Sequence, residues 1–209
     1  MISSLTAADF DRIRRGYDDD PAASQSLQAE AYTSADWYKT EQNAVFAHSW
    51  QWVCHMEKVR EPGAYTTTMI AGNSIAIVRD KDGTLRAFYN VCKHRAHELL
   101  QGEGTVNHIM CPYHAWAYKL DGQLAVAPHT GSLKGFDKSE ICLDTVQVEE
   151  FCGFVYVNLD PNAAPLAQQS GDLRREIMYW APEVEELTFG HRLTYDIKSN
   201  WKNVVDNFL

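Results

Sequence analysis

The sequence predicts an α+β protein built from three consecutive parts. We expect a helical N-terminal arm over residues 1–50, an antiparallel β domain over residues 51–160 and the start of an α+β domain over residues 161–209. The hydrophobic period changes from about 3.6 residues to about 2 near Gln51, which separates helix from strand. Short strands with turn signals every eight to twelve residues or so are typical of antiparallel β domains. The PNAAP segment at Pro161–Pro165 has the composition of a domain boundary.

The N-terminal arm carries two helix signals. Thr6 precedes the first helical pattern and has Asp9 three residues later, which is the spacing of a capping box. Pro21 disfavours helix at the residue before it, so the first helix must end ahead of it. Ser34 is placed to cap a second helix, which we expect from Ala35 to Trp50.

The β domain contains seven segments with the period of strands. Gly72 and Asn73 predict the turn of a hairpin. Residues 128–144 carry turn formers without strand periodicity and predict a long loop. The expected strands are Trp52–Cys54, Ala64–Ala71, Ser74–Arg79, Leu85–Val91, Val106–Met110, Val146–Glu150 and Phe154–Asn158.

The last part predicts a helix, a strand and a second helix. Asp172 to Leu187 has a helical pattern that Pro182 breaks or kinks. Residues 191–198 alternate polar and apolar side chains, so we expect a strand there. Asn200 is placed to cap a final helix whose apolar face is Val204, Val205 and Phe208.

Composition narrows the class of protein. The net charge of −9 on 209 residues argues against nucleic acid and anionic membrane as partners. No apolar run approaches about eighteen residues, and the N-terminus lacks a signal-peptide core, so we expect no membrane segment. Cys54, Cys142 and Cys152 show no regular spacing, so we expect reduced thiols in a cytoplasmic protein.

Two short motifs carry the chemistry. They read CKH at residues 92–94 and CPYH at residues 111–114. Two thiolates and two imidazoles suit either a tetrahedral zinc ion or an iron–sulfur cluster. The single residue between Cys92 and His94 is tighter than the usual zinc-knuckle spacing, which favours iron. One Cys and one His in each motif also allow two thiolates on one iron and two imidazoles on the other.

Together, the motifs CKHR and CPYHAW resemble the cluster-binding motif of Rieske non-haem iron oxygenases, in their ring-hydroxylating type α subunits. The resemblance implies an antiparallel β Rieske domain that holds a [2Fe-2S] cluster. That family often has Gly where Ala96 and Ala115 stand here, and from these two alanines we expect that neither position needs a positive φ. The implied ligands are Cys92, His94, Cys111 and His114, with Arg95, Tyr113 and Trp116 beside them.

The resemblance continues at residues 200–209, which look like the start of the family's catalytic-domain helix. Asn207 matches a family position near a mononuclear Fe(II). The family's bridging acid and the two His ligands of that iron are expected just beyond Leu209. We therefore expect a fragment without catalytic residues of its own, ending in a truncated catalytic domain. The mononuclear iron would belong only to the full-length protein.

For the full-length protein, the resemblance implies a homotrimeric oxygenase. A ferredoxin or an NAD(P)H-dependent reductase would supply electrons to the cluster. The cluster would pass them to the mononuclear iron for O2-dependent hydroxylation of a small-molecule substrate. Residues 85–129 look closer to enzymes that act on quaternary ammonium compounds, such as choline, glycine betaine or carnitine. Hydroxylation of an aromatic ring stays the alternative.

Two other classes of protein stay open. A stand-alone Rieske ferredoxin would carry electrons without an oxygenase, but it would need only the β domain. A structural zinc module would hold one colourless metal ion on the same four side chains.

Overall fold

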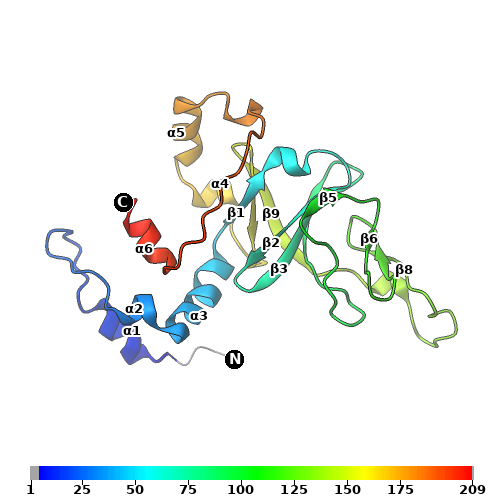
Figure 1. Ribbon diagram of the computed structural model, residues 1–209, viewed down its shortest axis with the longest axis horizontal. Coiled ribbons are helices and arrows are strands. Elements are labelled where there is room, and N and C mark those ends of the chain that lie inside the picture. Colours follow the sequence, from blue (N-terminus) through cyan, green and yellow to red (C-terminus); the bar gives the residue numbers. More distant parts are fainter. Residues whose placement is uncertain (1–4, 209) are drawn as a thin grey trace. The chain divides into compact units, whose positions relative to one another are not determined.

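The computed structural model describes residues 5–208. Residues 1–4 of the predicted N-terminal arm and Leu209 of the last predicted part lie outside the described residues. The chain divides into two compact units, whose elements are labelled in Figure 1. One unit combines the residues up to Val45 with those from His191 onward, and the other runs from Phe46 to Gly190. Helices and antiparallel strands together confirm the α+β class. The three-part domain division stays a prediction.

The larger unit is organised around a seven-stranded antiparallel sheet with the order β1-β10-β9-β4-β3-β2-β5. A small sheet with the order β6-β7-β8 projects from one end of it (Figure 1). The strands are β1 (Gln51–His55), β2 (Ala64–Ile70), β3 (Asn73–Arg79), β4 (Leu85–Tyr89), β5 (Glu103–Thr105), β6 (Ile109–Met110), β7 (Ala117–Tyr118), β8 (Leu124–Val126), β9 (Thr145–Phe151) and β10 (Phe154–Asn158).

The strands β5, β7 and β8 are not among the seven expected, and two of the expected strands differ in detail. Ile70 pairs with Asn73, so the β2–β3 turn is Ala71-Gly72, one residue earlier than expected. Both turn residues have positive φ, 47° and 79°, which matches the twist of a two-residue hairpin. The strand expected over residues 106–110 shortens to β6, and the residues just before it pair with β2 as β5.

The core of the larger unit lies on both faces of the main sheet. Ile75 and Ile77 of β3 are fully buried on one face with Val59, Val155 and Val157. The alternate residues of β3, Ala76 and Val78, are buried in a second cluster. That second cluster also contains Cys92 and Cys111, so the predicted thiol ligands belong to the packed core. The ligands are therefore set on a rigid scaffold.

Short helices follow the sheet within the same unit. They are α4 (Leu166–Gln169) and α5 (Leu173–Trp180), and 3₁₀ turns occur at Phe46–His48, Met56–Val59, Lys138–Glu140 and Val184–Glu186. The helix expected to reach Leu187 ends at Trp180, because Pro182 disfavours helix at the residue before it. Tyr179 and Trp180 are exposed at its end.

The smaller unit joins three N-terminal helices to one C-terminal helix. They are α1 (Ala7–Arg14), α2 (Glu30–Thr33), α3 (Ala35–Ala44) and α6 (Trp201–Asp206). The predicted caps are confirmed: Thr6 and Asp9 form a capping box, and the side chains of Ser34 and Asn200 accept hydrogen bonds from backbone N–H groups of the helices they begin. Helix α3 ends at Ala44 instead of Trp50, and a 3₁₀ turn replaces its last turn.

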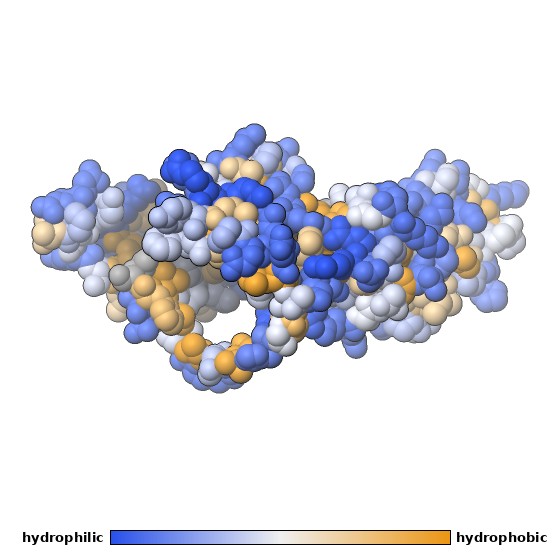
Figure 2. Space-filling view, turned by 90° about the horizontal axis from the view of Figure 1, so that it is seen from above, coloured by the Kyte–Doolittle hydropathy of each residue, from blue (hydrophilic) through white to orange (hydrophobic). Residues whose placement is uncertain are grey.

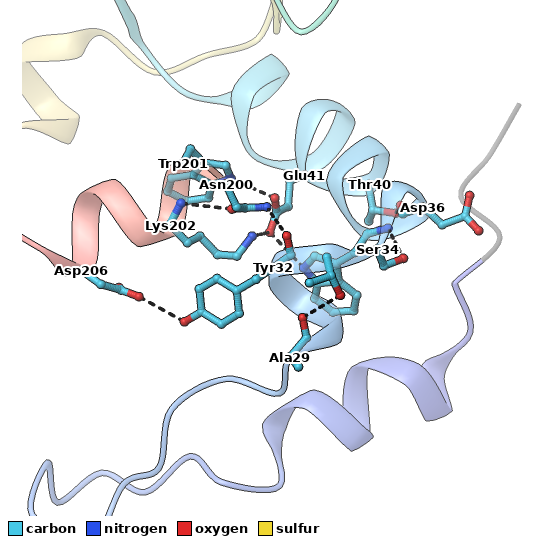
Figure 3. Close-up of polar contacts among 12 residues, drawn as sticks. Ala29, Tyr32, Ser34, Asp36, Thr40, Glu41, Asn200, Trp201, Lys202 and Asp206 are labelled. Atoms are coloured by element: carbon cyan, nitrogen blue, oxygen red, sulfur yellow. Dashed lines mark hydrogen bonds and ion pairs between the residues drawn. The ribbon is translucent and has the colours of Figure 1, made fainter. Parts of the chain in front are cut away.

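Glu41 of α3 holds α6 in this unit, as the close-up in Figure 3 shows. Its side chain is buried, and one carboxylate oxygen accepts hydrogen bonds from Lys202 Nζ and from Trp37 Nε1, the latter at 2.9 Å. The other oxygen accepts from Trp201 Nε1 at 2.8 Å. A buried carboxylate is stable only when its charge is paired and its oxygens are hydrogen-bonded, and both conditions are met here.

The strand predicted over residues 191–198 is wrong. These described residues have no regular structure, and Leu193, Tyr195 and Ile197 are 69%, 76% and 56% exposed. A strand needs a neighbour for its backbone groups, and among the described strands none pairs with this segment. The alternation of polar and apolar side chains was therefore not enough to predict a strand here.

Hydrophobic side chains reach the surface in small groups within a largely hydrophilic face (Figure 2). Within residues 5–208, none of the helices is long and apolar enough to span a bilayer.

Candidate metal centre

The two predicted motifs form loops with the same backbone closure. We call residues 92–97 loop 1 and residues 111–116 loop 2. In loop 1, Cys92 N–H donates to the carbonyl of His97 at 2.8 Å, and Ala96 N–H donates back to the carbonyl of Cys92 at 3.0 Å. Loop 2 repeats this pattern at the same two distances, from Cys111 to Trp116 and from Ala115 to Cys111. Each Cys therefore begins a tight loop whose fifth residue is an Ala.

Both of these alanines adopt the left-handed conformation, with φ of 56° at Ala96 and 57° at Ala115. The expectation that neither position needs a positive φ is wrong. The chain must reverse within six residues so that each Cys N–H meets a carbonyl five residues later, and a left-handed residue completes that reversal. This conformation costs a residue with a Cβ about 1–2 kcal/mol.

Cys92 and Cys111 belong to one core cluster of the larger unit, and His94 and His114 contact each other. Cys92 and Cys111 are each 2% exposed and neither is in a disulfide. The rings of His94 and His114 lie 4.7 Å apart between centroids, edge to face.

The inner nitrogens of the two histidines are the clearest sign of a metal. His94 Nδ1 and His114 Nδ1 are buried, and neither has a hydrogen-bond partner among residues 5–208. A buried polar atom without a partner costs about 1–3 kcal/mol, whereas a neutral imidazole nitrogen is a good ligand for iron or zinc. Burial, followed by the positive charge of neighbouring His and Arg side chains, lowers the pKa of His114 and favours that neutral form. These residues fit a bound metal group.

Among the described residues, no group of three or more His, Cys, Asp or Glu side chains is placed to hold a single metal ion. In a Rieske cluster the ligands are divided, with two thiolates on one iron and two imidazoles on the other. Two buried thiols and two inward Nδ1 atoms match that division in number and type.

Tyr118 is a site residue that the sequence reasoning missed. It is fully buried on β7, and its hydroxyl lies 3.3 Å from Cys92 Sγ. The same hydroxyl oxygen accepts a hydrogen bond from Lys93 N–H at 3.0 Å, which leaves its proton free to be donated to the sulfur. Burial and the bond to Cys92 raise the pKa of Tyr118, so it stays a donor. No local sequence pattern indicates this contact, because Tyr118 and Cys92 are 26 residues apart.

Aromatic rings cover both histidines. The indole of Trp116 stacks on the ring of His94, with centroids 4.9 Å apart and planes at 7°. Tyr113 packs against His114 at 3.7 Å between centroids. Trp116 is 8% exposed and Tyr113 is 57% exposed, so the two covers differ in their access to water. Both residues were singled out beside the cluster, and both touch a candidate ligand.

Two other singled-out residues have less contact with the site. Arg95 is exposed, and its charge helps to lower the pKa of His114. Asn207 ends α6 in the smaller unit, so its role near a mononuclear iron stays a prediction.

A groove opens beside the two histidines. Its volume is about 640 Å³, and it is lined by His94, His114 and Trp116 together with residues of the predicted long loop, among them Pro128, Leu133 and Phe136. The side chain of Phe136, from this loop, meets Trp116 edge to face. The groove gives a second molecule access to the histidine edge.

Comparison with known proteins identifies the domain that carries these loops. A Rieske [2Fe-2S] domain is matched over residues 49–137. The chain is 44% identical over 190 residues to the carnitine monooxygenase oxygenase subunit of Escherichia coli K12, covering 90% of this chain and 51% of that protein. It is 34% identical over 182 residues to the chloroplastic choline monooxygenase of Beta vulgaris, covering 85% of this chain and 41% of that protein.

A solved structure agrees with these relatives. The quaternary ammonium Rieske monooxygenase CntA, in complex with L-carnitine, superposes with a TM-score of 0.82 at 40% identity, over 86% of this chain and 51% of that one. The chain thus spans about half the length of the relatives it matches. On this evidence from sequence and fold together, the chain belongs to the Rieske oxygenase α subunits, on the quaternary ammonium monooxygenase side of that family.

Proposed function

We propose that this chain holds a Rieske [2Fe-2S] cluster through Cys92, His94, Cys111 and His114 and serves as the electron-transfer part of an oxygenase. The observation that carries the proposal is the pair of buried, unpartnered Nδ1 atoms, together with the burial of both thiols. A bound cluster of this type supplies one-electron transfer. The residues around it have three separate tasks.

The first task is to favour the reduced state. Tyr118 donates to Cys92 Sγ, and the Lys93 N–H holds that hydroxyl in the donating orientation. Because a reduced cluster carries one more negative charge, a donor at the sulfur stabilises it and raises the reduction potential.

The second task is to exclude water, and Trp116 does this by covering His94 from the core side.

The third task is to present an edge of the two histidines to a partner. With Nδ1 turned inward, Nε2 of His94 and His114 is the nitrogen left to donate a hydrogen bond to a group that enters the groove. A carboxylate or carbonyl on another subunit or protein suits that position.

For the longer protein, we infer an O2-dependent hydroxylase with a mononuclear Fe(II) outside this chain. Electrons would come from a ferredoxin or an NAD(P)H-dependent reductase, and the assembly would be a homotrimer. The relatives' names support a quaternary ammonium substrate of the carnitine or choline class. A ring-hydroxylating enzyme is the second candidate, supported by 33% identity to the large oxygenase component of the naphthalene 1,2-dioxygenase system of Pseudomonas putida. Cys54, Cys142 and Cys152 are in no disulfide, which supports a cytoplasmic location within the same proposal.

A metal and sulfide assay on the purified chain tests the cluster. We expect two iron atoms and two sulfides per chain, visible absorption that bleaches with dithionite, and an EPR signal only after reduction. One zinc ion without sulfide or colour would contradict the proposal and favour a structural zinc module. The longer protein should consume O2 when a reductase and carnitine, choline or naphthalene are added. If it holds a cluster but consumes no O2 with any of them, a stand-alone electron carrier is favoured.

A further inference from the structure

The two loops are supported differently at their bases. Loop 2 emerges from paired strands, in which Met110 faces Ala117 and Ile109 faces Tyr118. Loop 1 has only one isolated bridge at its base, between Val91 and Glu98. A single bridge constrains a loop less than a ladder does, so loop 1 needs another support.

The side chain of Asn90 supplies that support. Asn90 is fully buried and lies two residues before Cys92. Its Oδ1 accepts hydrogen bonds from the N–H groups of Leu99 at 3.3 Å and Leu100 at 2.9 Å. Its Nδ2 donates to the carbonyl of Leu100 at 2.7 Å. The amide therefore joins the residue that enters loop 1 to the residues that leave it, as a paired strand would.

Asn90 is itself tied to the main sheet. Its backbone N–H donates to the carbonyl of Ser74 at 2.9 Å, and its Nδ2 donates to Ser74 Oγ at 3.1 Å. Ser74 Oγ in turn donates to Glu98 Oε1 at 2.8 Å, which ties the far side of the bridge to β3. Loop 1 is thus connected to β3 from both of its ends.

We propose that Asn90 is a positioning residue that fixes loop 1, and with it Cys92 and His94, opposite the ligands of loop 2. This inference rests on the proposed [2Fe-2S] cluster and names the group that prepares half of its site. Without the amide, the residues before and after loop 1 lose the side-chain link between them, and the bond from Tyr118 to Cys92 loses its fixed geometry. The cluster is then held less firmly and its reduction potential changes.

The test compares Asn90→Ala with Asn158→Ala, both made in the whole chain. Asn158 is the control because it is also fully buried at the end of a strand of the same unit. Its Oδ1 accepts from Asp160 N–H at 3.0 Å, whereas its Nδ2 has no partner among the described residues, so it joins no two segments as Asn90 does. Both variants remove a buried amide and both should lower the midpoint of thermal unfolding. Only Asn90→Ala should speed the rate at which an iron chelator removes the visible absorption of the cluster. We expect an increase of about tenfold or more, because several buried hydrogen bonds are lost.

The reduction potential and EPR spectrum of the retained cluster separate positioning from general stability. Asn90→Ala should shift both, whereas Asn158→Ala should leave both as in the wild type. Ser74→Ala keeps the three bonds from Asn90 to Leu99 and Leu100, and also the backbone bond from Asn90 to β3. It removes only the bonds of the Ser74 hydroxyl, so it should speed cluster loss less than Asn90→Ala. If Asn90→Ala does not fold, Ser74→Ala against Asn158→Ala decides the question.

Equal rates of cluster loss and equal spectra in the Asn90 or Ser74 variants and in the Asn158 variant would overturn the inference. A wild-type chain without iron and sulfide would instead overturn the proposed function, before any variant is compared.

Discussion

Loop 1 and loop 2 have the same backbone conformation but differ in their surroundings. Both close through the same pair of hydrogen bonds and both place an alanine at a φ near 56°. Their histidines occupy different positions, two residues after the Cys in loop 1 and three in loop 2. Loop 1 is supported by buried amide and hydroxyl groups, whereas loop 2 is supported by strand pairing. One backbone turn can therefore present a His at either of two positions, and the side chains around each loop set the properties of its ligands.

Loop 2 also covers both histidines. Trp116 belongs to loop 2 but stacks on His94 of loop 1, and Tyr113 of the same loop lies against His114. The two loops therefore act as one site, although more than a dozen residues separate them in the sequence. The following substitutions test where they are equivalent and where they differ.

The largest effect should come from the thiols, where the loops are equivalent. Cys92→Ser and Cys111→Ser each remove a thiolate that a cluster requires, so we expect the bound iron and the visible absorption to be lost in both variants. Iron and sulfide assays measure this loss. Cys54→Ser is the control, because Cys54 is also a buried thiol of the same unit and lies outside both loops. Full iron content in either loop variant would remove that Cys from the ligand set.

The aromatic covers should differ in their effect on stability. Trp116→Leu removes most of a buried ring that packs on His94 and Phe136, and we expect a loss of about 2–4 kcal/mol in the unfolding free energy. Tyr113→Leu changes an exposed side chain and should cost less than about 1 kcal/mol. Urea unfolding of the metal-free chain measures both. Equal losses would mean that the two covers are energetically alike.

Tyr118→Phe tests the hydrogen bond that only loop 1 receives. Removing a donor from Cys92 Sγ makes the reduced state less stable, so the reduction potential should fall by tens of millivolts, about 59 mV for each tenfold change in a one-electron equilibrium. Protein-film voltammetry measures the potential. Tyr156→Phe, on β10, is the control and should leave the potential unchanged. An unchanged or higher potential in Tyr118→Phe would contradict the donor role.

The smallest effect should come from the two left-handed alanines. Ala96→Gly and Ala115→Gly relieve backbone strain and also make the unfolded chain more flexible, so each should stabilise the chain by no more than about 1 kcal/mol. The two gains should be similar because the φ values are similar. Ala117→Gly, in β7, has no positive φ to relieve and should destabilise the chain. Unfolding in urea gives the three values, and a loss at both loop alanines would refute the strain argument.

The sequence by itself determined the chemistry of the site and most of the scaffold. Four ligand-type side chains at tight spacing predicted a metal centre, and in the structure both thiols are buried and both His Nδ1 atoms are buried without a partner. Strand period and turn residues predicted most of the antiparallel strands, and Ser34 and Asn200 predicted two helix starts. These features depend on neighbouring residues, and local physics acts on them directly.

Only the tertiary structure decided which distant groups meet. Tyr118 reaches Cys92 across 26 residues, and Glu41 reaches Lys202 across 161, and neither contact leaves a local pattern. The positive φ of Ala96 and Ala115 follows from closing each loop, which the identity of the residue does not reveal. The segment 191–198 failed as a strand for the same reason, since alternation gives a segment the face of a strand but not the neighbour that its backbone requires.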